Sequence, residues 1–120
     1  MLWHVHQVRV GVMAVNKYTM LQESLAAIGK GSMTVFGQSM KPILESGSKI
    51  DFEVRATYKV GDICFSKVNG RFVDCHLITK VGPDGRFLIS NNHGWDNGWA
   101  SIIYGKAVRA THKGVTKELT

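Results

Sequence analysis

The sequence has little cysteine and no long apolar run. It contains two cysteines in 120 residues, Cys64 and Cys75, eleven positions apart. This spacing is not that of a metal site, and nothing marks the chain as secreted, so we interpret both as reduced core thiols and expect neither a metal nor a cofactor. No window approaches the roughly 20 apolar residues that a membrane span requires. The sequence therefore predicts no membrane span.

The first fifteen residues also lack the features of a signal peptide. His4, His6 and Arg9 interrupt their apolar residues. No long apolar stretch precedes a cleavage site of small residues. These absences favour a soluble protein of the cytoplasm.

Blocks of like charge are absent as well, although the chain as a whole is basic. The formal net charge is +6 and the sequence pI is about 9.6. A basic balance favours acidic partners such as nucleic acid. The lysines and arginines are spread along the chain, however, and no five of them form a run. The charge therefore leaves nucleic acid open as a partner without indicating a dedicated binding tract.

One helix is predicted near the N-terminus. Residues 17–28 are helix formers, and Leu21, Leu25 and Ile28 fall on one face. Gly29 follows, and a glycine at this position is typical of a helix end.

The remainder of the chain has the pattern of short strands joined by tight turns. Asn69-Gly70 is the strongest hairpin signal, and Pro83-Asp84-Gly85 predicts a second turn. An Asn- and Gly-rich loop is expected at 90–99. Strands are predicted at 2–15, 33–37, 49–56, 63–68, 71–81, 86–90 and 101–110.

These patterns together predict a mainly β fold, a small coiled antiparallel β domain with a short N-terminal helix. We expect the β domain to occupy residues 33–110. Residues 1–32 then form a strand and helix extension, and the polar residues 111–120 form a flexible tail. No repeat or second domain is indicated.

The stretch GQSMKPIL, residues 37–44, places a serine in a setting suited to nucleophilic chemistry. A serine nucleophile needs a base within hydrogen-bond reach and donors for the developing oxyanion. Gly37 lets the backbone turn tightly, so that amides near Ser39 can point at a substrate carbonyl. Taken alone, a Gly-x-Ser turn is a weak indication of catalysis.

Two downstream residues complete a candidate triad. His76 lies within the predicted strand 71–81, and Asp96 lies in the loop at 90–99. An imidazole held by a carboxylate is the arrangement that activates serine in many hydrolases. The alternative for His76 is a packed strand side chain, and for Asp96 an Asx-turn. Both alternatives stay open on the residues alone.

The order of several motifs resembles the superfamily that joins signal peptidases with LexA-type self-cleaving repressors. GQSMKPIL resembles its nucleophile box, usually Gly-x-Ser-Met-x-Pro. Further along, YKVGDICFSKV, HLITKV, ISNNHGWDNGW and IIYGKAV resemble the Gly-Asp turn and strand, the base-bearing strand, the Gly-Asp-Asn loop and the closing strand. The five motifs occur in the family's order and cover residues 33–108.

The resemblance implies a serine endopeptidase that acts on a polypeptide substrate without a cofactor. Ser39 would be the nucleophile, His76 the general base and Asp96 the residue that orients the imidazole. Gly37, Gln38 and Met40 would form the oxyanion and substrate-binding positions.

The identity of the base has alternatives. Most bacterial members use lysine, whereas the eukaryotic and archaeal signal peptidases use histidine, and HLITKV aligns best with the histidine form. A shift of one residue places Cys75 in the base position, on the other face of the strand. Lys67 and Lys80 are further candidates that fit the motif spacing less well.

The chain departs from the family pattern in three respects. Gly47-Ser48 stands where the family has Gly-Asp, and Ser90-Asn91-Asn92 stands where it has Gly-Asp-Asn. We also see neither a membrane anchor nor a DNA-binding domain before Ser39. These departures suggest a soluble, phage-type or mobile-element member. They also favour the alternative of a catalytically inactive peptidase-like module that binds a host protein or nucleic acid, in an oligomeric state the sequence does not indicate.

Overall fold

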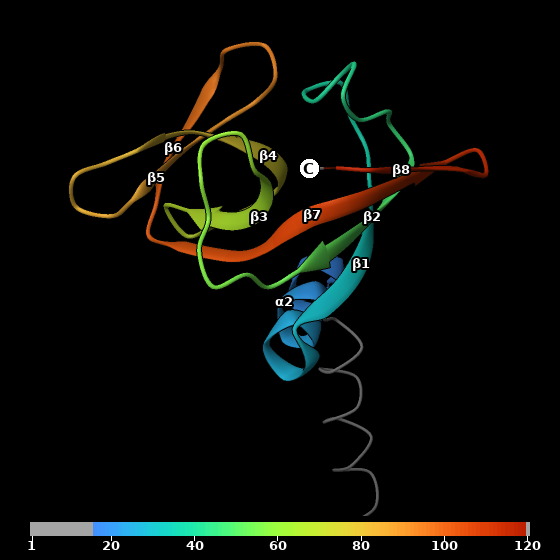
Figure 1. The fold of residues 1–120 in the computed structure, drawn as a ribbon, viewed down its shortest axis with the longest axis horizontal. Coiled ribbons are helices and arrows are strands. Elements are labelled where there is room, and N and C mark those ends of the chain that lie inside the picture. Colours follow the sequence, from blue (N-terminus) through green and yellow to red (C-terminus); the bar gives the residue numbers. More distant parts are fainter. Residues whose placement is uncertain (1–15, 120) are drawn as a thin grey trace, which may run out of the picture.

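The structure, a computed structural model, describes residues 16–119 and has one helix followed by eight strands (Figure 1). The mainly β fold with a short helix ahead of an antiparallel sheet confirms the predicted fold class. The strand predicted at 2–15 lies outside the described residues. The elements are α2 (Lys17–Ile28), β1 (Lys30–Val35), β2 (Ser48–Glu53), β3 (Ile63–Val68), β4 (Arg71–Val81), β5 (Phe87–Ser90), β6 (Asp96–Ala100), β7 (Ile102–His112) and β8 (Val115–Glu118).

Helix α2 has the predicted bounds and well-formed ends. The Asn16 side chain accepts a hydrogen bond from the Thr19 amide at 3.0 Å, which caps the N-terminus. Gly29 ends the helix in a left-handed conformation. Leu21 and Leu25 are buried, whereas Ile28, predicted on the same face, is exposed. The helix therefore contributes side chains to the core. No helix in residues 16–119 has the length and apolar character needed to cross a membrane.

All pairs of neighbouring strands are antiparallel, and the sheet order is β1-β2-β7-β3-β4-β5-β6. The long strand β7 lies inside the sheet and pairs with three strands. Its first part pairs with β3, its later part with β2, and its last four residues pair with β8 (Figure 1).

The sheet curls until β6 approaches β3. Gly98 lies in β6 with φ of 133°, and a Cβ atom added there would lie 2.8 Å from a methyl carbon of Val68. Only glycine accommodates both that backbone conformation and that approach. The curl leaves two groups of buried side chains, a larger one that includes α2 and a smaller one around Ile78 and Ile89.

Both cysteines are free and buried, as predicted, with Cys64 in the smaller group and Cys75 in the larger. An aromatic group of Tyr18, Phe65 and Phe72 joins the helix to the sheet, with ring centroids 5.6–6.3 Å apart. The stacking of these rings fixes the start of α2 beside β4.

Two predictions of irregular structure were wrong. The expected tail at 111–120 is instead the end of β7 and all of β8, joined by Lys113-Gly114 with φ of 49° and 78°. Positive φ at both positions suits a two-residue hairpin turn. The expected loop at 90–99 contains most of β6, whose backbone pairs with β5.

Candidate functional site

Ser39 lies in the loop of residues 36–47, which joins β1 to β2. The loop is closed at its base by a 2.8 Å bond from the Gly47 amide to the Val35 carbonyl. The side chains of Met40 and Leu44 are buried and anchor it to the core. Ser39, between these fixed points, is half-buried.

The loop leaves backbone donors free beside the serine hydroxyl. The Gly37 amide donates to Ser46 Oγ at 3.0 Å, and the backbone has φ of 115° at Gly37. Within residues 16–119, the amides of Gln38, Ser39 and Met40 have no hydrogen-bond partner. Unpartnered amides next to a nucleophile are the groups from which an oxyanion hole is made.

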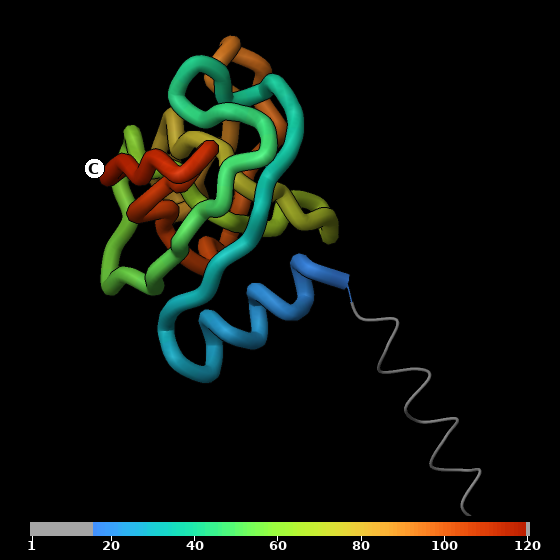
Figure 2. The backbone as a smooth tube through the Cα atoms, turned by 90° about the vertical axis from the view of Figure 1, so that its right-hand side faces the viewer, coloured from blue at the N-terminus to red at the C-terminus, as the bar shows by residue number. Residues whose placement is uncertain are grey.

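A second loop, between β5 and β6, holds the Ser39 loop in place. The Asn92 amide donates to the Ser39 carbonyl at 2.8 Å, and Asn92 Nδ2 donates to the Lys41 carbonyl at 2.9 Å. His93 Nε2 lies 3.0 Å from the Gln38 carbonyl and donates to it, since a carbonyl only accepts. Figures 1 and 2 both show the two loops at the same end of the molecule.

This supporting loop is shaped by Asn91. Its Oδ1 accepts hydrogen bonds from the amides of His93 and Trp95, at 2.8 and 2.9 Å. The Asn91 amide in turn donates to the Trp95 carbonyl at 2.9 Å. The asparagine pair thus performs a structural task that the sequence analysis did not assign.

Ser39 opens into a narrow cleft against strand β4. The cleft has room for about one water molecule. Strand β4 contributes Asp74 and Cys75 to its wall, and His76 does not line it. The other lining residues are Val35, Phe36, Gly37, Met40, Leu44 and Glu45.

His76 lies next along β4 and pairs with the carboxylate of Asp74. His76 Nδ1 is 3.5 Å from Asp74 Oδ1, and within the described residues this buried nitrogen has no hydrogen-bond partner. The two residues share a strand face because side chains alternate along a strand. Leu77 pairs with Ser90, so the register places His76 beside the supporting loop at Asn91.

The environment of Asp74 favours its ionised form. Burial alone would raise its pKa, but the His76 side chain, the Cys75 amide and the charge of Lys17 together hold the pKa below its usual value. The Cys75 amide donates to Asp74 Oδ1 at 2.8 Å. The strand therefore carries a charged carboxylate beside an imidazole.

Asp96 does not take the position that the sequence analysis expected. Its Oδ1 accepts a 2.6 Å hydrogen bond from Ser90 Oγ, which also lies 2.8 Å from Thr79 Oγ1. It forms no ion pair with His76. Ser90 pairs with Leu77, and adjacent residues of a strand point to opposite faces. The carboxylate beside His76 is therefore Asp74.

The alternative bases are a buried thiol in the cleft and two lysines outside it. Burial, followed by the charges of Asp74 and Cys64, raises the pKa of Cys75 well above its usual value, so this thiol stays neutral. The Lys67 ammonium lies over the Phe72 ring at 4.6 Å. Lys67 and Lys80, like His76, do not line the cleft, and no carboxylate beside either lysine is found among the described residues.

Comparison with known proteins found no relative of the chain. The sequence matches no protein-family model, and no curated protein or solved structure shows significant similarity to the chain. Among residues 16–119, no three His, Cys, Asp or Glu side chains come together to hold a metal ion.

A signal for Asp74 was present in the sequence. Asp74 and His76 are two positions apart in a strand whose bounds were predicted correctly, which is the spacing that brings side chains to one face. No comparable signal existed for Asn92, because its bonds join residues about fifty positions apart.

Proposed function

We propose that the protein is a serine endopeptidase of the LexA/signal-peptidase type, with Ser39 as the nucleophile and His76 as the general base. One observation carries the proposal. Ser39 lies in a cleft walled by β4, and β4 also carries the imidazole–carboxylate pair of His76 and Asp74. The candidate base is thus on the strand that forms one wall of the Ser39 cleft, two residues from Asp74, which lines it.

In the proposed reaction, Ser39 Oγ attacks a peptide carbonyl while its proton passes to His76 Nε2. The imidazolium then protonates the leaving amine, and water releases the acyl group from Ser39 by the reverse transfer. Asp74, in the role the sequence assigned to Asp96, stabilises the imidazolium through Nδ1 at 3.5 Å. No hydrogen bond joins Ser39 to His76 in the described residues, and such contacts commonly tighten only when substrate binds.

The free amides of the Ser39 loop supply the second requirement. The amides of Gln38, Ser39 and Met40 are unpartnered within residues 16–119, so two of them can bind an oxyanion without breaking a bond. One such donor commonly contributes about 3 kcal/mol to transition-state binding.

The test compares single variants on a mixed peptide library read by mass spectrometry. We expect Ser39→Ala and His76→Ala each to lower product formation at least about 100-fold. The matched control is Ser101→Ala, which removes an exposed hydroxyl and should cleave like the wild type. Equal products from Ser39→Ala and wild type contradict the proposal.

A second function, a non-catalytic binding module, is favoured by the lining of the cleft. Cys75, a neutral thiol, faces the Ser39 cleft where an active enzyme needs its base. In this case the wild type yields no new peptide product, but it binds a host protein or nucleic acid. For nucleic acid, an affinity for duplex DNA that falls steeply with added salt is the expected result.

A further inference from the structure

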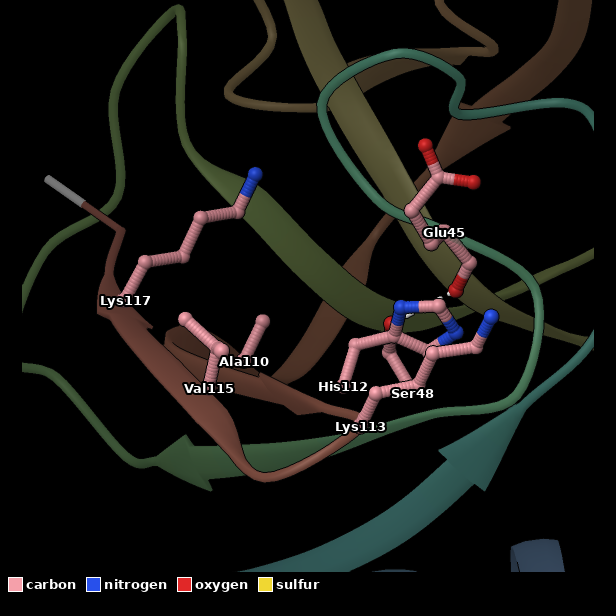
Figure 3. Close-up of a pocket in the computed structure, with 7 residues that line it drawn as sticks. All are labelled: Glu45, Ser48, Ala110, His112, Lys113, Val115 and Lys117. Atoms are coloured by element: carbon pink, nitrogen blue, oxygen red, sulfur yellow. Dashed lines mark hydrogen bonds between the residues drawn. The ribbon is translucent and has the colours of Figure 1, made fainter.

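A second cavity lies beside the Ser39 loop, between it and the β7–β8 hairpin. Its volume is about 340 Å³, at the lower end of the usual range for ligand sites. It is lined by Glu45, Ser48, Ala110, His112, Lys113, Val115 and Lys117 (Figure 3).

The two walls of this cavity are tied together. Lys117, on β8, donates a hydrogen bond to the carbonyl of Ile43 in the Ser39 loop. The Ser48 hydroxyl donates to the Glu45 carbonyl at 2.6 Å, which fixes the loop end of the wall. Figure 3 shows Lys117 on one side of the pocket and Glu45 on the other.

The lining combines an apolar floor with a basic rim. Ala110 and Val115 supply apolar surface, and the exposed residues Lys113 and Lys117 supply positive charge. The one acidic lining residue, Glu45, is paired with Lys41 at 3.5 Å. A group with a short apolar stem and a carboxylate head matches this arrangement.

The cavity also adjoins the Ser39 cleft. Glu45 lines both spaces, so the two adjoin at this side chain and one extended chain could reach both. The lining contains no Phe, Tyr or Trp side chain, and His112 is its one ring on which a nucleotide base could stack, which favours a peptide over single-stranded nucleic acid.

We propose that this cavity binds an acidic side chain of the polypeptide substrate, so that the protein selects substrates with Asp or Glu a few residues from the bond at Ser39. The selection of a substrate rests on the proposed function, whereas binding at the cavity is measurable without catalysis.

Binding is measured by amide chemical shifts in Ser39→Ala protein. The probes are two acetylated, amidated dodecapeptides of alanine and serine that carry Glu-Glu or Gln-Gln at the centre. We expect the Glu-Glu peptide to shift the amides of Ala110, His112 and Val115 and to bind at least about five-fold more tightly. Equal affinities, or no shift at these amides, overturn the inference.

Charge reversal at the rim is the decisive variant. Lys113→Asp with Lys117→Glu should abolish the preference, and aspartate suits the positive φ at position 113. The control, Lys59→Glu with Lys80→Glu, changes the net charge equally at exposed sites outside the cavity and should retain the preference. Lys113→Asn alone, which keeps Lys117 and its bond to the loop, should halve the preference or more. A preference that survives the double reversal overturns the inference.

Other occupants are separated by two further probes. A Gln-Gln peptide with a free C-terminus that binds as tightly as the Glu-Glu peptide overturns the assignment to a side chain. Tighter binding of a dT dodecamer at the same amides overturns the assignment to a peptide. If the wild type cleaves peptides with no preference for those that contain acidic residues, only this inference is overturned. If it binds the Glu-Glu peptide selectively but cleaves nothing, only the proposed function is overturned.

Discussion

At the scale of single residues, strand β4 places a carboxylate, a thiol and an imidazole in succession. Asp74 is held ionised, Cys75 is held neutral, and His76 offers a buried nitrogen 3.5 Å from the Asp74 carboxylate. Because side chains alternate along a strand, Asp74 and His76 lie on one face of β4, while Cys75 packs in the core.

The lowered pKa of Asp74 predicts a pH-dependent contribution to stability. A depressed carboxyl pKa stabilises the fold above the unfolded value of about 3.9, and that contribution is lost as the pH falls through the folded value. The difference in unfolding free energy between wild type and Asp74→Asn should therefore be larger at pH 7 than at pH 3. Urea titrations at the two pH values measure it, and a difference that grows on acidification contradicts the role given to Asp74.

Both thiols should be inert in the folded protein. Burial, followed by the charge of Asp62, raises the pKa of Cys64 to about 12, and Cys75 is shifted upward as well. Ellman's reagent at pH 8 should therefore modify the native chain at least about 100-fold more slowly than the chain in urea. The exposed Ser101→Cys variant provides the fast-reacting control. Rapid labelling of two native thiols would refute this prediction.

At the scale of elements, the loop between β5 and β6 acts as a support for the loop between β1 and β2. Asn92→Ala removes the side-chain bond to the Lys41 carbonyl and should cost about 1 kcal/mol of stability. Amide exchange of Lys41 and Leu44, whose amides are hydrogen-bonded within the loop, should accelerate. Any peptidase activity should fall more than stability does, because Ser39 loses its fixed position. Asn97→Ala is the matched control, since Asn97 is exposed and makes no side-chain hydrogen bond within residues 16–119. Equal effects of the two substitutions would remove the supporting role.

The elements that the sequence predicted well are those bounded by strong turn residues. Asn69-Gly70 defines the hairpin, and β3 and β4 have the predicted bounds. Strand β6 was missed because Asp96, Asn97 and Gly98 have low strand propensity and are held by backbone pairing to β5. Strand β8 was missed because it is short, polar and wholly exposed.

The candidate site was predicted in part, for a similar reason. The Gly-x-Ser turn at residues 37–39 is visible in the sequence but is a weak indication alone, and Ser39 became a candidate through the order of the motifs that follow it. The identity of the carboxylate beside His76 depends on which face of β4 each side chain occupies and on where the β5–β6 loop places Asp96. The loop brings Asp96 within hydrogen-bond distance of Ser90, and spacing along the chain does not reveal this contact.

At the scale of the whole molecule, the C-terminal hairpin belongs to the folded unit. Arg109 Nε lies 2.9 Å from Glu118 Oε2, the Leu119 amide donates to the Val108 carbonyl, and the Leu119 side chain packs on the larger buried group. The hairpin also forms one wall of the cavity beside Ser39.

Removal of residues 113–120 should therefore destabilise the protein by at least about 2 kcal/mol, because strand hydrogen bonds and the contact of Leu119 are lost together. Denaturant midpoints measure the change. Glu118→Gln, which removes only an exposed ion pair, should cost less than about 1 kcal/mol. Unchanged stability after the truncation would restore the description of these residues as a tail.

The position of β7 between β2 and β3 affects when the protein can fold during synthesis. Strand β7 lies between β2 and β3 in the sheet and is the neighbour of each on one side. In the described part of the chain, however, it follows all the strands but β8. Until a ribosome has synthesised Ile102–His112, both strands lack that neighbour, and the sheet cannot be assembled between them. The domain must therefore complete its fold after translation of Ile102–His112, so that Ser39 and β4 are held in their final frame only once that strand has been made.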